Sequence, residues 1–295
     1  MKKSICFSLL ALSLSLCAAM AGCAIRPAGA STAKQVTSSH TVDGSFHALD
    51  IRTVEADVTL LPTEGDGCRV VCCETEKITH TVKTEDGTLR IRREDTRSAA
   101  EKLLASPPLS VTVYLPQADY EALTVSTVSG KITVDEAFSF GPADLETTSG
   151  VIDLLAATSG DLTVGTVSGA ITLRRHTGGD VRVGSTSGAI HAANVTGEDM
   201  HFSSTSGRIE LSDVMAEGEL EAEGVSGALA LTRADGATLT LTTVSGSITA
   251  SLCSPKAFRC ETVSGRISTP PDTAGASVCH AETVSGSITL TMADA

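Results

Sequence analysis

One short phrase, Ser-Gly followed by a small or charged residue and then Ile or Leu, recurs nine times after about residue 120 of this 295-residue chain. Successive copies are 20, 19, 19, 19, 20, 19, 19 and 21 residues apart. A fixed period of this size predicts a solenoid, in which each coil buries its apolar face only against its neighbours. The repeated glycines are Gly130, Gly150, Gly169, Gly188, Gly207, Gly227, Gly246, Gly265 and Gly286.

Alignment of the copies on the glycine separates inward from outward positions. The position two residues after the glycine is always Ile or Leu, and the position four residues after it is mostly aliphatic. The positions five and seven residues before the glycine are also mostly apolar, so both flanks alternate with the period of a strand. Each coil is therefore expected to be a strand, a Ser-Gly turn and a second strand, and the glycine is expected to supply a positive φ in the turn.

These patterns predict an all-β fold, namely a single-stranded parallel β-solenoid of about nine coils of 19–21 residues over 123–295. No separate cap follows the last coil in the sequence. The strand expected at 288–292 would then be an open edge, which predicts possible end-to-end self-association through the C-terminal coil.

The segment 41–122 is rich in alternating apolar residues but lacks the Ser-Gly phrase. It predicts a β-rich cap that covers the first coil, because a solenoid needs an atypical unit at its end. The sequence Ser-Ala-Ala-Glu at 98–101 has the spacing of a capping box, and it predicts a short helix near 98–105.

The first 23 residues have the pattern of an export signal, with Lys2 and Lys3 before an apolar run. Met20-Ala21-Gly22-Cys23 resembles the bacterial lipobox, which implies lipidation of Cys23 and attachment to a membrane. The alternatives are secretion after Met20-Ala21 and an uncleaved anchor. A polar stretch over 24–40 is expected to be a tether.

The composition excludes some classes of partner. The formal net charge of −13 argues against nucleic-acid binding, and aromatic residues make up only 3% of the chain. An outward-facing polar surface with few aromatic anchors predicts weak, multivalent contact with an envelope protein or glycan.

The chain over about 41–292, with a strand ending Tyr114-Leu115-Pro116 before the Thr-x-Ser-Gly-x-Ile-x-Leu coils, resembles a bacterial cell-envelope domain family catalogued as "putative adhesin". The resemblance implies a surface or envelope location, and relatives are often associated with envelope-stress regulation. It brings no catalytic residues.

Serine, cysteine and histidine side chains could each form a reactive site. The repeated serines lack the Gly-x-Ser-x-Gly spacing of a nucleophile elbow, so a turn role is expected. No metal or other cofactor is expected, because Cys68, Cys72 and Cys73 have no standard zinc spacing, although they could also pair. Core packing is expected for Cys253, Cys260 and Cys279, and solvent exposure for His176, His191, His201 and His280.

Carboxylates offer the one alternative chemistry. Glu146, Glu223, Glu261 and Glu282 share the outward column four residues before the glycine, and Glu261 and Glu282 fall on neighbouring coils. Such a pair is compatible with a polysaccharide-active or calcium-dependent β-helix. The sequence favours a non-catalytic, membrane-anchored binding or scaffold module, adhesin-like or related to envelope stress.

Overall fold

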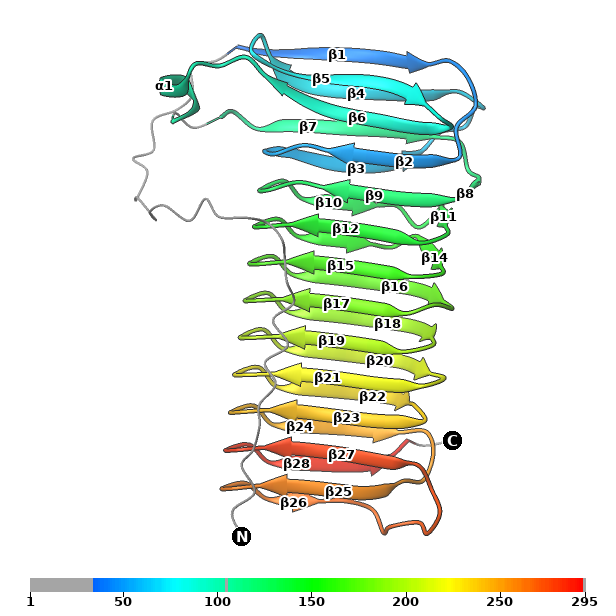
Figure 1. Cartoon of the computed structure of the whole chain (residues 1–295), viewed down its shortest axis with the longest axis vertical. Coiled ribbons are helices and arrows are strands. Elements are labelled where there is room, and N and C mark those ends of the chain that lie inside the picture. The colour runs from blue at the N-terminus through cyan, green and yellow to red at the C-terminus, as the bar shows by residue number, and fades with distance from the viewer. Residues whose placement is uncertain (1–33, 104–105, 294–295) are drawn as a thin grey trace.

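The chain folds into a rod in which two long β-sheets lie face to face (Figure 1). The computed structural model describes residues 34–103 and 106–293, so the predicted signal segment and Cys23 lie outside the described residues. Most coils contribute one strand to each sheet and run in parallel with their neighbours. The predicted parallel β-solenoid is therefore confirmed, and its core is the space between the two sheets.

Sheet A has sixteen strands. Its main path is β1 (Gln35–Val42), β4 (Cys68–Thr75), β7 (Leu109–Leu115), β3 (Ala56–Pro62), β10 (Ile132–Val134), β13 (Ile152–Leu154), β16 (Ile171–Thr177), β18 (Ile190–Gly197), β20 (Ile209–Ala216), β22 (Leu229–Asp235), β24 (Ile248–Leu252), β28 (Ile288–Met292) and β26 (Ile267–Ser268). Beside this path, short strands form part of a third face: β8 (Asp119–Tyr120), β11 (Ser139–Phe140) and β14 (Ala157–Ser159).

Sheet B has twelve strands. Their spatial order is β25 (Ala257–Thr262), β27 (Val278–Thr283), β23 (Thr238–Thr243), β21 (Glu219–Gly224), β19 (Met200–Ser204), β17 (Val181–Ser185), β15 (Leu162–Thr166), β12 (Ala143–Thr147), β9 (Ala122–Ser126), β2 (Ala48–Arg52), β6 (Thr88–Asp95) and β5 (Ile78–Glu85).

The predicted aliphatic columns form the core. Ile171, Ile190 and Ile209 are vertical neighbours in the register of β16, β18 and β20, and each is fully buried. Burial of an Ile or Leu side chain contributes roughly 1.5–3 kcal/mol of transfer free energy, so a stack of such residues drives adjacent coils together.

The nine repeated glycines are needed for a reason that differs from the predicted one. None of them has a positive φ. A Cβ at Gly188 would lie 1.6 Å from the carbonyl oxygen of Gly169, and at the other eight positions the corresponding distance is 1.6–1.9 Å. Glycine is required because the backbones of adjacent coils approach too closely for any side chain.

A column of hydroxyls, three residues before eight of the nine glycines, holds the Ser-Gly turns, and all of them are buried except the half-buried Thr262. Ser204 Oγ accepts a hydrogen bond from Gly207 N at 2.9 Å and donates to Gly188 O on the next coil at 3.4 Å. The same pattern of bonds to the turn glycine and to a carbonyl of an adjacent coil repeats at Thr127, Thr147, Thr166, Ser185, Thr243, Thr262 and Thr283. Gly224 interrupts the column. The serines of the Ser-Gly pairs lie at the turn, and some of them donate to backbone carbonyls: Ser129, Ser245 and Ser264.

A left-handed residue bends the second strand of four consecutive coils. Arg175, Asn194, Asp213 and Arg233 have φ values of 56°, 57°, 56° and 51°. The bend turns the following residues inward, so that His176, Val195 and Val214 fill the core of a third face. Asp213 and Arg233 stack as an ion pair on adjacent coils, which supports the strained backbone.

The N-terminal segment belongs to the same two sheets. Strands β2 and β3 pair with β9 and β10 on one side and with β6 and β7 on the other, so they form a coil that lies between two later segments. Antiparallel strands β1, β4 and β5 cover this end of the rod. Strand β1 occupies the last part of the expected tether, and the predicted helix is α1 (Ala99–Lys102), whose capping box at Ser98 is confirmed.

The last two coils are stacked in reverse order (Figure 1). Strands β27 and β28 lie between β23–β24 and β25–β26, so the predicted open edge at 288–292 is wrong for Ile288 and Thr289, which pair with β26. The free edge is β25 and β26. Asp272, in the segment that leads back, accepts a hydrogen bond from Phe258 N on that edge at 2.8 Å.

Buried Lys256 fastens the reversed order. Its Nζ donates to Gly236 O at 2.8 Å and to Ser277 Oγ at 2.7 Å, and it forms an ion pair with Asp235. Lys256 therefore ties the start of β25 both to an earlier coil and to the segment that returns to β27. A buried ammonium group is tolerated here because each of these partners satisfies part of its charge or its donors.

Candidate functional site

The predicted acidic pair lies on the outer face of sheet B. Glu261 and Glu282 are direct neighbours in the register of β25 and β27. Glu261 is exposed and Glu282 is half-buried. Strands of a sheet are about 4.8 Å apart, so the two carboxylates can reach one ion or one sugar ring.

The other carboxylates of this column do not join the pair. Thr242 lies between Glu223 and Glu282, and Glu146 lies several coils away. Burial, and then the nearby charge of Glu221, raises the pKa of Glu223, while burial raises that of Glu146. The pair of Glu261 and Glu282 thus has two carboxylates, and no third His, Cys, Asp or Glu joins them among the residues that the structure describes.

The cap contains a different cluster, which the sequence did not reveal. Cys72 and Glu74 point inward from β4 in sheet A, and His80 points inward from β5 in sheet B. One ligating atom from each of the three residues lies within 4.8 Å of the other two. Within 34–103 and 106–293, these residues are the only group of three or more side chains close enough to hold a metal ion.

Hydrogen bonds orient the cluster. Glu74 Oε1 lies 2.9 Å from His80 Nδ1 and accepts from His80 N at 2.5 Å, and Glu74 Oε2 accepts from Ser38 Oγ at 2.8 Å. His80 Nε2 lies 3.1 Å from Thr53 Oγ1. Burial lowers the pKa of His80 and raises that of the Cys72 thiol to about 12, with Glu74 adding to the latter shift.

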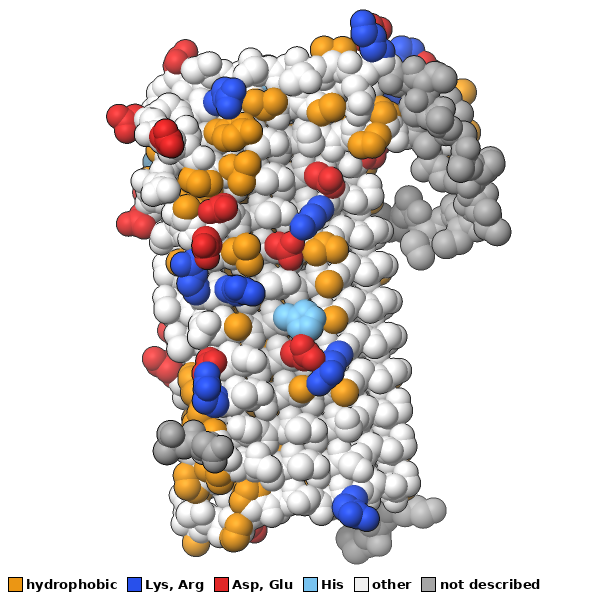
Figure 2. Space-filling model, turned by 180° about the vertical axis from the view of Figure 1, so that it is seen from behind, with side chains coloured by type: hydrophobic (Ala, Val, Ile, Leu, Met, Phe, Trp, Pro, Cys, Tyr) orange, Lys and Arg blue, Asp and Glu red, His pale blue; other side chains and the backbone are white. Residues whose placement is uncertain are grey.

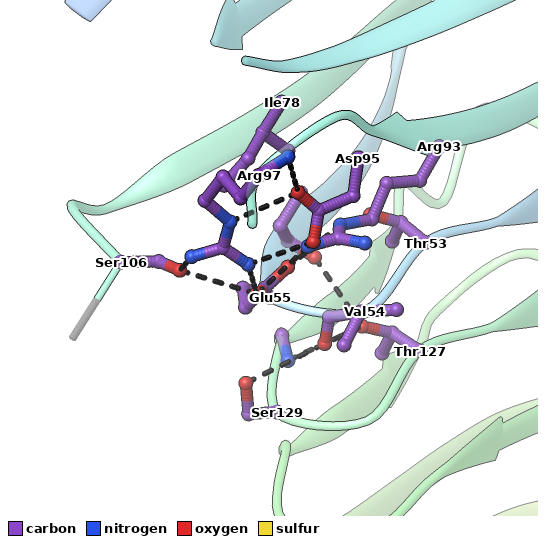
Figure 3. A network of polar contacts seen from close by, with 12 residues as sticks. Thr53, Val54, Glu55, Ile78, Arg93, Asp95, Arg97, Ser106, Thr127 and Ser129 are labelled. Carbon is purple, nitrogen blue, oxygen red and sulfur yellow. Dashed lines mark hydrogen bonds and ion pairs between the residues drawn. The ribbon is translucent and has the colours of Figure 1, made fainter. Parts of the chain in front are cut away.

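A network of ion pairs closes the side of the cap (Figure 3). Arg93 and Arg97 both contact Glu55 and Asp95, and Arg97 Nη1 donates to Ser106 Oγ at 2.9 Å. Hydrogen bonds from Arg97, and from Arg93, hold the pKa of Asp95 well below its usual range. These residues connect the segment before β3, the end of β6 and the segment before β7, so their role is structural.

Two predictions about histidine and cysteine are wrong. His176 is fully buried, with Nδ1 2.9 Å from Thr158 Oγ1, because the left-handed residue before it turns its side chain into the core. Cys253 is exposed, because its coil has no such bend and Leu252 occupies the inward position beside Ala234. Cys279 is buried as predicted, Cys260 is half-buried, and all six described cysteines are free thiols.

The outer face of sheet A carries no concentrated charge. Figure 2 shows both charge signs scattered among uncharged side chains on this side. Lys131 pairs with Asp153 at 2.7 Å, and Glu210 contacts both His191 and Arg208. On sheet B, His201 pairs with Glu221 at 2.8 Å. A shallow groove of about 620 Å³ lies where 62–66 meets Pro116 and Gln117.

The family model described as "Toastrack DUF4097" matches residues 46–291. The chain belongs to this family. The match spans the Ser-Gly coils and the strands of the cap from β2 onward, so these form one family unit. No curated protein matches the chain.

Two solved structures share the fold, and a third is less similar. A "putative adhesin" from Parabacteroides distasonis ATCC 8503 is 11% identical, with a TM-score of 0.51 over 88% of this chain and 98% of that chain. A "putative lipid binding protein" from the same strain is 13% identical, with a TM-score of 0.50 over 88% and 97%. A "putative adhesin" from Bacteroides fragilis NCTC 9343 is 15% identical, with a TM-score of 0.47 over 87% and 97%.

No helix among the described residues has the length and apolarity needed to cross a membrane.

Proposed function

We propose that this Toastrack protein is an extracytoplasmic binding or scaffold module, which is anchored to a membrane through Cys23 and acts without catalysis. The observation that carries the proposal is the rod itself. Its interior is filled by aliphatic columns, and its two outer faces carry short polar side chains mixed with charged ones along the whole rod. Such a surface offers many weak contacts, which become strong only when several are made together.

The anchor and the binding surface need separate tests. For the anchor, we expect mass analysis of the mature N-terminus to find a lipid on Cys23, and Cys23→Ser to move the protein from the membrane fraction to the medium or periplasm. An unmodified N-terminus beginning after Ala21 would contradict anchoring and leave a secreted rod.

For binding, the mature rod is displayed on beads at graded density and incubated with purified cell-wall glycan, with host-type glycans and with intact cells. We expect retention to rise steeply with rod density and single rods to bind weakly. A matched rod carrying Thr172→Lys and Thr249→Lys changes the charge of the sheet A face without touching the core. Retention that is equal for the two rods and independent of density would refute contact through this face.

A second function is favoured by one specific observation, the register pairing of Glu261 with Glu282. Two adjacent carboxylates suit a polysaccharide-active or calcium-dependent β-helix. The double variant Glu261→Gln/Glu282→Gln is compared with Glu146→Gln/Glu223→Gln, which alters the same column elsewhere. Loss of glycan turnover or of calcium binding only in the first variant would establish this function in place of passive contact.

A further inference from the structure

The cluster of Cys72, Glu74 and His80 combines three different ligating groups in the interior of the cap. All three residues are nearly or fully inaccessible, with relative exposures of 0%, 5% and 3%. They come from strands in opposite sheets, so the fold brings them together although they are separated by a turn in the sequence. This placement differs from a solvated group of acids on a surface.

No lysine or arginine among the described residues balances the carboxylate of the cluster. Glu74 forms its only ion pair within the described residues with His80 and has no lysine or arginine partner there. Buried charges in proteins are usually paired or coordinate a metal. A divalent cation would offset the carboxylate together with a thiolate at Cys72, which leaves the site neutral.

The ligand types select the metal. A thiolate, an imidazole and a carboxylate are the set that binds Zn²⁺, whereas Ca²⁺ and Mg²⁺ prefer oxygen ligands only. Zinc bonds of about 2.0–2.3 Å separate tetrahedral ligand atoms by roughly 3.3–3.8 Å. The ligating atoms already lie within 4.8 Å of one another, and only small shifts are needed: Glu74 Oε1 and His80 Nδ1, now 2.9 Å apart, would separate by a few tenths of an ångström.

Neighbouring hydroxyls hold the ligands as outer partners do in metal sites. Ser38 Oγ donates to the far oxygen of Glu74, and Thr53 Oγ1 lies 3.1 Å from His80 Nε2, the ring nitrogen that faces away from Glu74. A partner at Nε2 fixes the orientation of the ring and leaves the lone pair of Nδ1 for the metal.

We propose that Cys72, Glu74 and His80 bind one Zn²⁺ ion, which fastens β4 in sheet A to β5 in sheet B. Zinc replaces the thiol proton of Cys72, which is released. It also binds His80 through Nδ1, and the ring proton then sits on Nε2 and donates to Thr53. The ion closes the end of the rod, where β5 has a single strand neighbour in sheet B. This site is independent of the surface function proposed above.

The test uses the mature chain after chelation, titrated with Zn²⁺ and, separately, with Co²⁺ as a spectroscopic probe. We expect one equivalent of metal to bind, the unfolding temperature to rise, and Co²⁺ to give a thiolate charge-transfer band. Cys72→Ser and His80→Gln should each weaken Zn²⁺ binding by more than about 100-fold, because loss of outer partners alone costs 10–100-fold. Ser38→Ala should fall within that smaller range.

Cys68→Ser is the matched control, since Cys68 is a buried thiol on the same face of β4 but outside the cluster. It should retain binding. The Co²⁺ spectrum of the unaltered chain decides the outcome even if a variant fails to fold. Absence of a thiolate band, or equal binding by the Cys72→Ser and Cys68→Ser chains, would overturn the proposal.

Discussion

Gly224 is the position at which the column of buried hydroxyls is interrupted, and Gly224→Ser tests what that column contributes. Gly224 pairs with Ser204 in the register of β19 and β21, so a serine there would place its hydroxyl in the same column. The new Oγ would accept from Gly227 N and donate to Gly207 O, as Ser204 does with Gly207 and Gly188.

The expected gain follows from these contacts. The two hydrogen bonds should each add about 1 kcal/mol to the free energy of unfolding. Replacing glycine restricts the unfolded chain, and this should add a further 0.4–1 kcal/mol, roughly. The new Cβ would lie 3.2 Å from Thr243 Oγ1, a tight contact that offsets part of this gain. We therefore expect Gly224→Ser to raise the free energy of unfolding by about 2 kcal/mol.

The measurement is urea unfolding followed by circular dichroism, combined with hydrogen exchange of the Gly227 amide. Ser204→Gly should lower stability by a similar amount, and Ser203→Gly, at the adjacent outward position, controls for the effect of glycine on the unfolded chain. A Gly224→Ser chain with unchanged stability and unchanged exchange at Gly227 would refute the reasoning.

Three further predictions test other features of the rod. Gly188→Ala should lower the free energy of unfolding by about 3 kcal/mol or more, because its Cβ would lie 1.6 Å from Gly169 O. Gly178 has a φ of +79° and open space around it, so Gly178→Ala should lower the free energy of unfolding by only about 1–2 kcal/mol in the same urea assay. Equal losses in the two variants would contradict the close approach of the backbones. Lys256→Met should lower the free energy of opening the last two coils by about 3 kcal/mol, since it leaves Asp235 without its cation. Hydrogen exchange should then become faster in β25 and β27 but not in β17. An equal increase in all three strands would contradict a local role of Lys256. Burial lowers the pKa of His176, so the unfolded chain binds more protons than the folded one, and the free energy of unfolding should fall as the pH drops below about 6.5. His176→Val, which matches Val195 and Val214 on the next coils, should reduce the slope of this free energy against pH by about one proton. An unchanged slope would contradict a buried neutral imidazole.

The repeat predicted the main part of the fold because each aliphatic column reports one inward position many times over. Ile171, Ile190 and Ile209 could be placed on top of one another from spacing alone. The hydroxyl column was visible in the same alignment, at Thr166 and Ser185, yet Thr and Ser are also common on exposed strands. Only the structure shows that these hydroxyls face inward and bond to the turn glycines.

Chemistry in the cap was hidden for a different reason. Cys72 and Glu74 alternate with outward residues on β4, and His80 lies on the next strand along the chain, but nothing in the sequence shows which sheet each strand joins. In the structure β4 and β5 belong to different sheets, and the three side chains meet across the core. The contact depends on which strands β4 and β5 pair with, and these pairings join segments that are distant in the sequence. The burial of His176 was not predicted for a similar reason, because nothing in the repeat indicates that Arg175 adopts a positive φ.

The order of the last coils shows the limit of reading a repeat. Coils with the same aliphatic column and the same Ser-Gly turn are nearly interchangeable as neighbours, so spacing cannot decide whether β25 or β27 stacks on β23. Features outside the repeat must decide it. In the observed order Lys256 contacts both Gly236 and Ser277, and the segment from β26 to β27 is long enough to return. This buried cation joins the last two coils to an earlier one, so its replacement should loosen the end of the rod before any other part.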